Sequence, residues 1–150
     1  MKNNVKFIFN IFLIGFIIFF INQYFFQICF IQGESMSPTL KKDSMILIKK
    51  FDLSINYNDI VVIKKKNKTI IKRVVGLPND SIKIDKYLYI NGNKKDDSYI
   101  EEAGEIKKEI LLRENEFFVL GDNIQNSIDS RFSEIGIIKK DEIIGQMIQF

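Results

Sequence analysis

Residues 59–75 read Asp-Ile-Val-Val-Ile-Lys-Lys-Lys-Asn-Lys-Thr-Ile-Ile-Lys-Arg-Val-Val, and this stretch decides the fold class. It holds two runs rich in isoleucine and valine, Asp59–Lys65 and Thr69–Val75, with polar residues between them. β-Branched side chains favour strands, because they pack well on a pleated surface. The stretch therefore predicts two strands rather than a helix.

Runs of the same kind occur on both sides of this stretch, and no long amphipathic helix separates them. The Asn91-Gly92 pair is a typical hairpin turn. The other runs are Ser44–Lys50, Ser81–Asp85, Tyr87–Ile90, Ile106–Leu112, Glu116–Leu120 and Glu142–Phe150. Short strands at this spacing predict an all-β domain, built as an antiparallel barrel or sandwich.

An uncharged stretch from Phe7 to Gly33 precedes the strands, and its centre, Ile11–Ile21, is apolar all round apart from Gly15. A helix of this length spans roughly 40 Å, more than the ~30 Å hydrocarbon core of a bilayer. A cleaved signal peptide needs small residues at its cleavage site, yet the only alanine is Ala103. A buried core helix would be shorter and carry a polar stripe. The stretch therefore predicts a single uncleaved transmembrane helix.

This anchor divides the chain into three predicted parts. Residues 1–6 form a short cytoplasmic tail, residues 7–32 form the anchor and an interfacial stretch, and residues 33–150 form the all-β domain. Lys2 and Lys6 favour a cytoplasmic N-terminus, which places the domain on the extracytoplasmic face. Lysines also follow the anchor, at positions 41, 42, 49 and 50. Long domains translocate largely regardless of such charges, so the short tail sets the predicted orientation.

Composition excludes several classes of chemistry. The chain carries 22 basic and 19 acidic residues, a net charge of +3, so nucleic acid is not an expected partner. It has no histidine, which excludes Ser-His-Asp triads, Cys-His dyads and histidine zinc sites. Cys29 is the only cysteine, which excludes an intrachain disulfide and a paired-cysteine redox site. Catalysis must therefore come from Ser, Lys, Asp, Glu, Tyr or backbone groups.

Two segments carry polar side chains in unusual settings. The first, Gly33–Leu40, reads Gly-Glu-Ser-Met-Ser-Pro-Thr-Leu and, taken alone, is equally typical of a turn. The second segment is Thr69–Asp80, where Lys72 alternates with Ile70 and Val74 on one face of the predicted strand. A cation on an apolar face is costly unless it is paired or neutral, although an edge-strand lysine can also extend to water.

A third segment, Gly121–Arg131, is rich in Asp, Asn and Ser. A calcium loop would need a ligand where Ile124 stands, and the central glycine of such a loop is missing. A hydrogen-bonded connection with an ion pair between Asp129 and Arg131 is the simpler alternative for this segment alone.

Together the three segments suggest a serine nucleophile activated by a neutral lysine. An ordinary lysine titrates near pH 10.4, so only about one in 10³ is neutral at pH 7. Burial lowers that pKa, and the apolar neighbours of Lys72 provide such burial. A hydroxyl such as that of Ser127 could orient the amine without adding charge.

These segments resemble those of bacterial type I signal peptidases, in the short Gram-positive-like form. The resemblance covers Gly33–Leu40, Asp-Ile-Val-Val at 59–62, Lys-Arg-Val-Val-Gly-Leu-Pro at 72–78, Leu-Tyr-Ile-Asn-Gly at 88–92, and Gly-Asp-Asn, Asn-Ser and Asp-Ser-Arg within 121–131. It implies that Ser35 is the nucleophile, that Lys72 is the general base, and that Ser127 positions the lysine amine. The supporting residues that it implies are Met36 beside the dyad and the ion-pairing Arg73, Asp122, Asp129 and Arg131.

The resemblance also implies a function. The family is made of membrane-bound serine endopeptidases that remove signal peptides from exported preproteins and cut after small residues. The resemblance implies an all-β fold, a substrate that adds as an extended strand, and no metal or cofactor. The implied partners are preproteins, the lipid bilayer and, by proximity, the secretion translocon. A nucleophile close to the bilayer would meet emerging cleavage sites at a raised effective concentration.

Four features depart from the family pattern. Some relatives supply an oxyanion-stabilising hydroxyl two residues before the nucleophile, where this chain has Gly33. Ile124 replaces a usual arginine, Asn79 replaces a usual glycine, and the segment Phe132–Gly136 is longer than in many relatives.

Two other functions remain as alternatives. One is a specialised processing peptidase for a single dedicated substrate, and another is a membrane-anchored binding module that has lost catalysis. Self-cleaving repressors share the Ser–Lys dyad, but they need a DNA-binding domain where this chain has its apolar helix.

Overall fold

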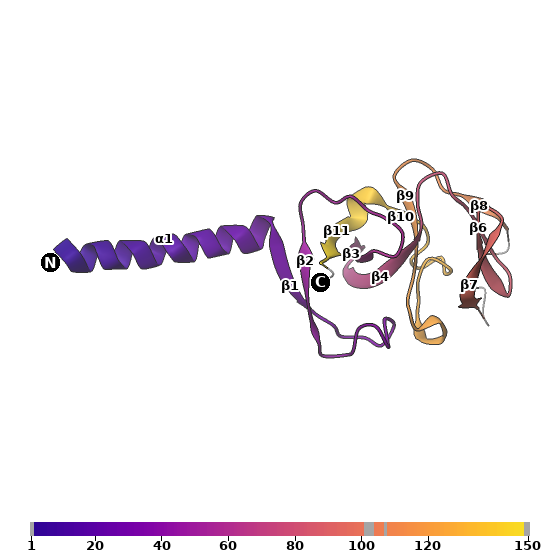
Figure 1. Cartoon of the computed structure of the whole chain (residues 1–150), viewed down its shortest axis with the longest axis horizontal. Helices are drawn as coiled ribbons and strands as arrows, with labels where there is room; N and C mark the ends of the chain where they lie inside the picture. Colours follow the sequence, from indigo (N-terminus) through magenta and orange to yellow (C-terminus); the bar gives the residue numbers. More distant parts are fainter. Residues whose placement is uncertain (1, 101–103, 107, 149–150) are drawn as a thin grey trace.

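The computed structural model describes residues 2–100, 104–106 and 108–148, and consists of a projecting helix and a β-rich body (Figure 1). The helix α1 spans Lys2–Tyr24. The strands are β1 Phe26–Phe30, β2 Met45–Lys49, β3 Ile60–Lys65, β4 Lys68–Gly76, β5 Ser81–Ile84, β6 Tyr87–Ile90, β7 Asn93–Tyr99, β8 Ile110–Leu111, β9 Glu116–Leu120, β10 Ile138–Lys139 and β11 Ile143–Met147. The described residues leave out 1, 101–103, 107 and 149–150. Residue 1 belongs to the predicted tail, residue 107 to the predicted strand run Ile106–Leu112, and residues 149–150 to the predicted run Glu142–Phe150.

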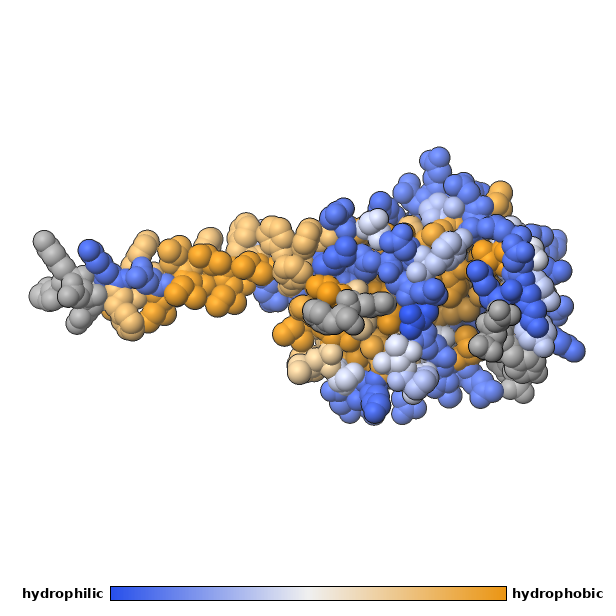
Figure 2. All heavy atoms as spheres, in the orientation of Figure 1, coloured by the Kyte–Doolittle hydropathy of each residue, from blue (hydrophilic) through white to orange (hydrophobic). Residues whose placement is uncertain are grey.

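The centre of helix α1, residues 11–21, is apolar around its whole circumference apart from Gly15, and the helix projects from the body (Figure 1). Its span Lys6–Tyr24 is 19 residues long, and none of it is buried. At about 1.5 Å per residue such a span matches the ~30 Å hydrocarbon core. Figure 2 shows it as a hydrophobic rod attached to a largely hydrophilic body. By length and composition this helix could cross a membrane, and its exposure sets it apart from the core helix of a soluble protein.

Antiparallel strands form two sheets in the body. The larger has seven strands in the order β1-β2-β11-β3-β4-β9-β10, and the smaller has four in the order β7-β6-β5-β8. The predicted all-β class is therefore confirmed. The large sheet is open rather than closed into a barrel, because no pairing among the described strands joins β1 to β10.

Most predicted strand runs are confirmed within one or two residues at each end, including both halves of residues 59–75. The Asn91-Gly92 turn also forms between β6 and β7, with positive φ angles of 52° and 76°. The run Ile106–Leu112 was predicted too long, since only Ile110–Leu111 pairs as β8. Three strands escaped prediction: β7 is almost wholly polar, β10 has two residues, and β1 lies inside the long apolar stretch.

Strand β1 sets where the sheet begins. It pairs residue by residue with β2, from Phe26 opposite Lys49 to Phe30 opposite Met45. The helix ends at Tyr24, so the sheet starts two residues later, inside the stretch that the sequence analysis treated as interfacial. Composition did not distinguish the two, because an edge strand and a membrane interface accept the same apolar residues.

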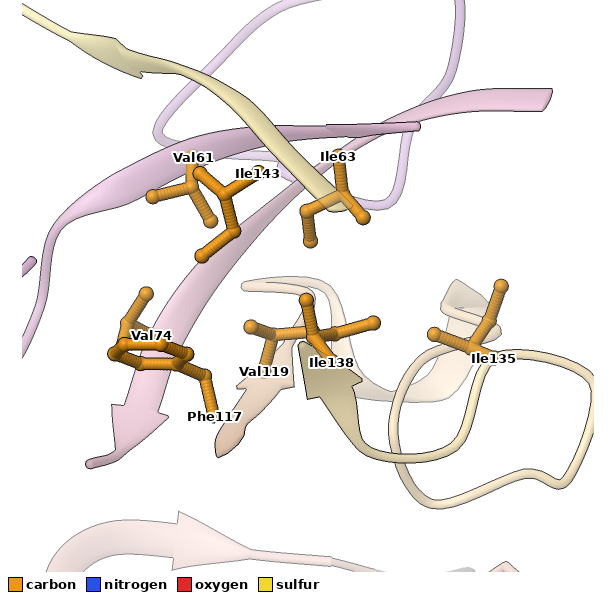
Figure 3. Packing of buried hydrophobic residues seen from close by; sticks show 8 residues of the cluster. All are labelled: Val61, Ile63, Val74, Phe117, Val119, Ile135, Ile138 and Ile143. Atoms are coloured by element: carbon orange, nitrogen blue, oxygen red, sulfur yellow. The ribbon is translucent and has the colours of Figure 1, made fainter. Parts of the chain in front are cut away.

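The β3–β4 hairpin is covered on both faces. On one face, Val61, Ile63 and Val74 pack with β9 and the C-terminal strands (Figure 3). On the other face, Ile60 and Val62 pack in a cluster with Met36, Leu40, Ile46 and Ile48. Burial of both faces explains the near-continuous apolar runs of residues 59–75 and leaves Lys72 deep in the body.

Candidate active site

Ser35 and Lys72 meet although 37 positions separate them in the chain. Ser35 lies in the turn that follows β1, and Lys72 lies in β4 opposite Val61 of β3. The Lys72 Nζ atom donates a hydrogen bond to Ser35 Oγ at 2.7 Å, and Lys72 is only 4% exposed. The structure therefore places a nucleophilic hydroxyl in direct contact with a buried amine.

Burial alters the chemistry of this amine. Desolvation is the largest influence on the pKa of Lys72 and lowers it from the ordinary value of 10.5. The negative charges of Asp129 and Asp122 raise this pKa, whereas the positive charge of Arg131 lowers it further. The net direction is downward, which enlarges the neutral fraction at neutral pH. A neutral Nζ can accept the Ser35 proton across the same 2.7 Å contact, as a general base requires.

The hydroxyl of Ser127 makes a different contact from the predicted one. Ser127 Oγ donates to Asp129 Oδ2 at 2.8 Å, and no hydrogen bond joins Ser127 to Lys72 in the part of the chain that the structure describes. Asp129 is fully buried. A buried carboxylate is the stronger acceptor, because hydrogen bonds to a charged group are stronger than neutral ones.

Asp129 also binds Arg131, which holds the loop together. Arg131 Nε donates to Asp129 Oδ1 at 2.8 Å, and Arg131 is 1% exposed. Its Nη2 also donates to the carbonyl oxygens of Ile124 and Ser127. Among the described residues, no group of three or more Asp, Glu, Cys or His could hold a metal ion. The loop is thus organised around a buried arginine.

Arg73, next to the buried lysine, is also paired. Its Nε and Nη2 donate to the two carboxylate oxygens of Asp122 at 2.7 and 2.6 Å, a bidentate arrangement. Its Nη1 donates to the Asn58 carbonyl at 2.8 Å. This pairing ties β4 to the start of the 121–131 loop, directly beside the Ser35–Lys72 contact.

Two residues for which the sequence analysis named no role, Gly121 and Asn123, hold the Ser35 turn. The Asn123 N–H donates to the Ser35 carbonyl at 2.9 Å, and Asn123 Nδ2 donates to the Glu34 carbonyl at 3.2 Å. A Cβ on Gly121 would overlap the Ser127 hydroxyl and the Ser35 carbonyl. The Gly-Asp-Asn motif marked these positions, but only the fold shows what they touch.

A cavity of about 480 Å³ contains the Ser35–Lys72 pair. One wall is β1 and the residues after it, up to Gly33, and the other is Thr69–Lys72 of β4. Met36, 2% exposed, lies in its floor with Val62. The β9 strand pairs with β4 only from Arg73 onward, so residues 68–72 leave one backbone edge of β4 unpaired among the described strands. We call this cavity the dyad groove.

A family model described as signal peptidase, peptidase S26, matches residues 3–150. The chain belongs to the signal peptidase family. Signal peptidase I U of Bacillus subtilis (strain 168) is 38% identical over 152 residues, which cover 91% of this chain and 81% of that protein. Signal peptidase I P of Bacillus subtilis subsp. natto is 31% identical, with coverage of 86% and 78%. The resemblance drawn from the sequence motifs is therefore confirmed.

A solved structure supports the same family fold. The crystal structure of a signal peptidase I from Enterococcus faecalis V583 aligns with a TM-score of 0.51 at 26% identity. The alignment covers 64% of this chain and 97% of that one. The antiparallel body described above is therefore the fold of this family.

Proposed function

We propose that this chain is a membrane-bound serine endopeptidase that removes signal peptides from exported preproteins, cutting after small residues. The observation that carries the proposal is the 2.7 Å contact between Ser35 Oγ and the buried Lys72 Nζ. In a chain without histidine, this pair joins a nucleophile to a base of lowered pKa. Membership of a peptidase family gives the pair a reaction to perform.

The proposed reaction has two steps. Ser35 Oγ attacks the carbonyl carbon of the cleaved peptide bond while Lys72 Nζ takes the hydroxyl proton. The tetrahedral intermediate collapses, the C–N bond breaks, and Lys72 returns the proton to the leaving amine of the mature protein. Lys72 then takes a proton from water, whose oxygen attacks the carbonyl carbon of the Ser35 ester. The ester C–O bond breaks, Lys72 returns the proton to Ser35 Oγ, and the signal peptide leaves with a new C-terminal carboxyl group.

The negative oxygen of each tetrahedral intermediate needs a donor. The Ser35 backbone N–H donates to no acceptor among the described residues, so it is free to fill this role. The contacts of Asn123 and Gly121 fix the turn that carries this N–H. We assign Ser127, Asp129 and Arg131 as positioning residues, since Ser127 packs against Gly121 and its hydroxyl is held by Asp129, which pairs with Arg131.

The substrate fits the dyad groove as an extended strand. The unpaired edge of β4 at residues 68–72 and the outer edge of β1 offer backbone donors and acceptors to such a strand. Alternate side chains of an extended strand point to the same face, so the first and third residues before the cut face the same wall. Met36 and Ile70 line the groove close to the dyad and leave room there for small side chains.

The anchor completes the proposal. We place α1 across the cytoplasmic membrane with its N-terminus inside, and the β-rich body on the extracytoplasmic face. Only Phe25 separates α1 from β1, which is a wall of the dyad groove, so the groove stays close to the membrane surface. Cleavage sites that leave the secretion translocon emerge at the same surface.

The test uses the full-length chain in detergent micelles with a preprotein that carries an Ala-x-Ala site. Mass spectrometry of the products should locate one cut directly after the second alanine. Ser35→Ala should release no product while its Tm stays close to that of the wild type; cutting by this variant would contradict the proposal. A panel of unrelated preproteins separates a general signal peptidase from a dedicated processing peptidase, which would cut one of them alone.

A further inference from the structure

A second cavity adjoins the same turn and the same strand as the groove, since Pro38, Thr39 and Arg73 line it. Its volume is about 950 Å³, and it is bounded by the large sheet, the small sheet and the turn after Ser35. Six aliphatic side chains line it, those of Val75, Leu88, Ile90, Ile100, Leu120 and Ile124, together with polar and charged residues that include Arg73 and Lys95. We call it the downstream cavity.

The downstream cavity continues the dyad groove along the same two chain segments. In β4, Lys72 lines the groove and the next residue, Arg73, lines the downstream cavity. In the turn, Ser35 and Met36 line the groove, whereas Pro38 and Thr39 line the downstream cavity. Ser35 and Lys72 thus line the groove, and residues a few positions further along both segments line the downstream cavity.

The sheet topology turns an extended substrate toward this second space. Beyond Lys72 the edge of β4 is occupied, because Arg73 pairs with Leu120 of β9. A strand bound along residues 68–72 cannot continue along β4 past the dyad. It has to leave the sheet across the Gly121–Ile124 loop, and Gly121, Asp122 and Ile124 all line the downstream cavity.

The lining selects for an apolar side chain rather than a charged one. Arg73 is the charged group nearest the dyad, but both carboxylate oxygens of Asp122 already neutralise it. Lys95 is the second cation of the lining, and its Nζ lies 5.7 Å from the centre of the Tyr57 ring, which also lines the cavity. The rest of the wall formed by the small sheet is aliphatic, and Thr39 is an exposed neutral residue at the turn. Apolar side chains placed among aliphatic walls are removed from water, which favours binding.

We propose that the downstream cavity binds the first residues of the mature protein, those just after the cleaved bond, and favours a bulky apolar side chain among them. This rests on the proposed function. The cavity makes the start of the mature protein, as well as the signal peptide, a determinant of the cleavage rate.

The test uses full-length wild type and preproteins that differ only in the first four mature residues. Each position carries Leu in one substrate and Ser in its partner, and the measurement is the ratio of the two kcat/KM values. At one or more positions the Leu substrate should be cut about tenfold faster, the size of discrimination that an apolar pocket gives. Thr39→Trp, which fills the cavity from an exposed position, should bring this ratio close to one.

Two further variants test whether the change in the ratio comes from the cavity lining. Val75→Thr keeps the shape of a lining side chain but makes it polar, so it should lower the ratio in part. Ser54→Trp is a matched control, because Ser54 is exposed and lines neither cavity, and it should keep the wild-type ratio.

A wild-type ratio near one at every position, or an unchanged ratio in Thr39→Trp, would overturn the inference and leave the proposed function standing. A wild type that cuts none of these substrates, or cutting by Ser35→Ala, would overturn the proposed function and the inference with it.

Discussion

Lys72 occupies a buried site that disfavours its protonated, charged form. Its side chain is buried, and desolvation is the main cause of its lowered pKa. A pKa that is lower in the folded than in the unfolded state means that the protonated lysine destabilises the fold. The same burial that prepares the amine as a base therefore weakens the protein at neutral pH.

Replacement of this lysine by an apolar residue of similar length should stabilise the protein. Lys72→Met is expected to have a higher Tm than wild type at neutral pH, by the equivalent of roughly 0.5–2 kcal/mol, the usual range for such replacements. Below its folded pKa, Lys72 carries the full penalty. The penalty fades as pH rises from that value towards the ordinary 10.5, so the gap in Tm should shrink. Calorimetry of both proteins from neutral to alkaline pH measures it, and a gap that is absent at neutral pH or constant with pH would refute the argument.

Gly33 offers a place to add an oxyanion donor. No atom lies within 4 Å of the position that a Cβ would take, so Gly33→Ser fits without a clash. A hydroxyl two residues before Ser35 would assist the Ser35 N–H, and one such donor is worth up to ~10²-fold in kcat in other enzymes. We expect Gly33→Ser to raise kcat with little change in KM. Gly33→Ala separates the hydroxyl from the added Cβ, and an equal gain in both variants would exclude a donor effect.

The sequence predicts the individual residues of the site better than their contacts. The apolar neighbours of Lys72 indicated its burial, which the structure reproduces. Ser127 was expected to orient the Lys72 amine, and the structure shows that its hydroxyl donates to Asp129. Spacing along the chain could not show this contact, because it depends on the fold placing the Ser127 hydroxyl against the buried carboxylate that also pairs with Arg131.

At the scale of elements, the loop after β9 positions the nucleophile. Gly121 lies between the Ser127 hydroxyl and the Ser35 carbonyl, and an added Cβ would overlap both. The Asn123 contacts to the same turn depend on this close approach.

Gly121→Ala should therefore push the Ser35 turn away from Lys72. We expect a loss of kcat/KM of about 10²-fold, since misplacement by about 1 Å has this effect on catalysis. Gly15→Ala is the matched control, because nothing lies within 4 Å of its added Cβ in the exposed helix. Activity of Gly121→Ala at the level of Gly15→Ala would show that the turn does not need this approach.

Outside the long apolar stretch that hides β1, the strands with an apolar face were predictable and the polar strand β7 was not. The β3–β4 hairpin was found because both of its faces are buried. Strand β7 reads Asn-Lys-Lys-Asp-Asp-Ser-Tyr and forms by pairing with β6 beyond the Asn91-Gly92 turn. The Asn91-Gly92 turn places β7 against β6, so β7 forms without a hydrophobic pattern of its own that could have predicted it.

At the scale of the whole molecule, the sheet begins before the predicted domain boundary. Strand β1 pairs with β2 over its whole length and also forms a wall of the dyad groove. A chain truncated at residue 33 would lack this wall, whereas a chain truncated after Tyr24 would lack only the helix.

Two truncated chains test this boundary. A chain that begins at Phe25 should fold and cut short soluble peptides at a rate near that of the full-length protein. A chain that begins at Glu34 should lose β1, unfold at a lower denaturant concentration and cut at least tenfold more slowly, since it lacks one edge of the groove. Circular dichroism and peptide cleavage measure both, and equal behaviour of the two chains would refute the structural role of β1.

The order of the strands within the sheets could not be predicted from the sequence. The motif spacing predicted an antiparallel all-β body, but not that β11 lies between β2 and β3. Pairing between strands far apart in the chain is selected by packing on both faces, which local composition does not encode. The dyad depends on this long-range order, because it brings the turn after β1 against β4.

The dependence of kcat/KM on pH, measured for full-length wild type and for Lys72→Ala, tests the central claim most directly. The account predicts that the wild-type rate rises with pH as Lys72 loses its proton, with a midpoint below the ordinary lysine value of 10.5. Lys72→Ala should be at least ~10³-fold slower at every pH, as expected for loss of a base that acts with the nucleophile. A wild-type rate without this basic limb, together with a Lys72→Ala rate close to that of wild type, would contradict the Ser35–Lys72 dyad.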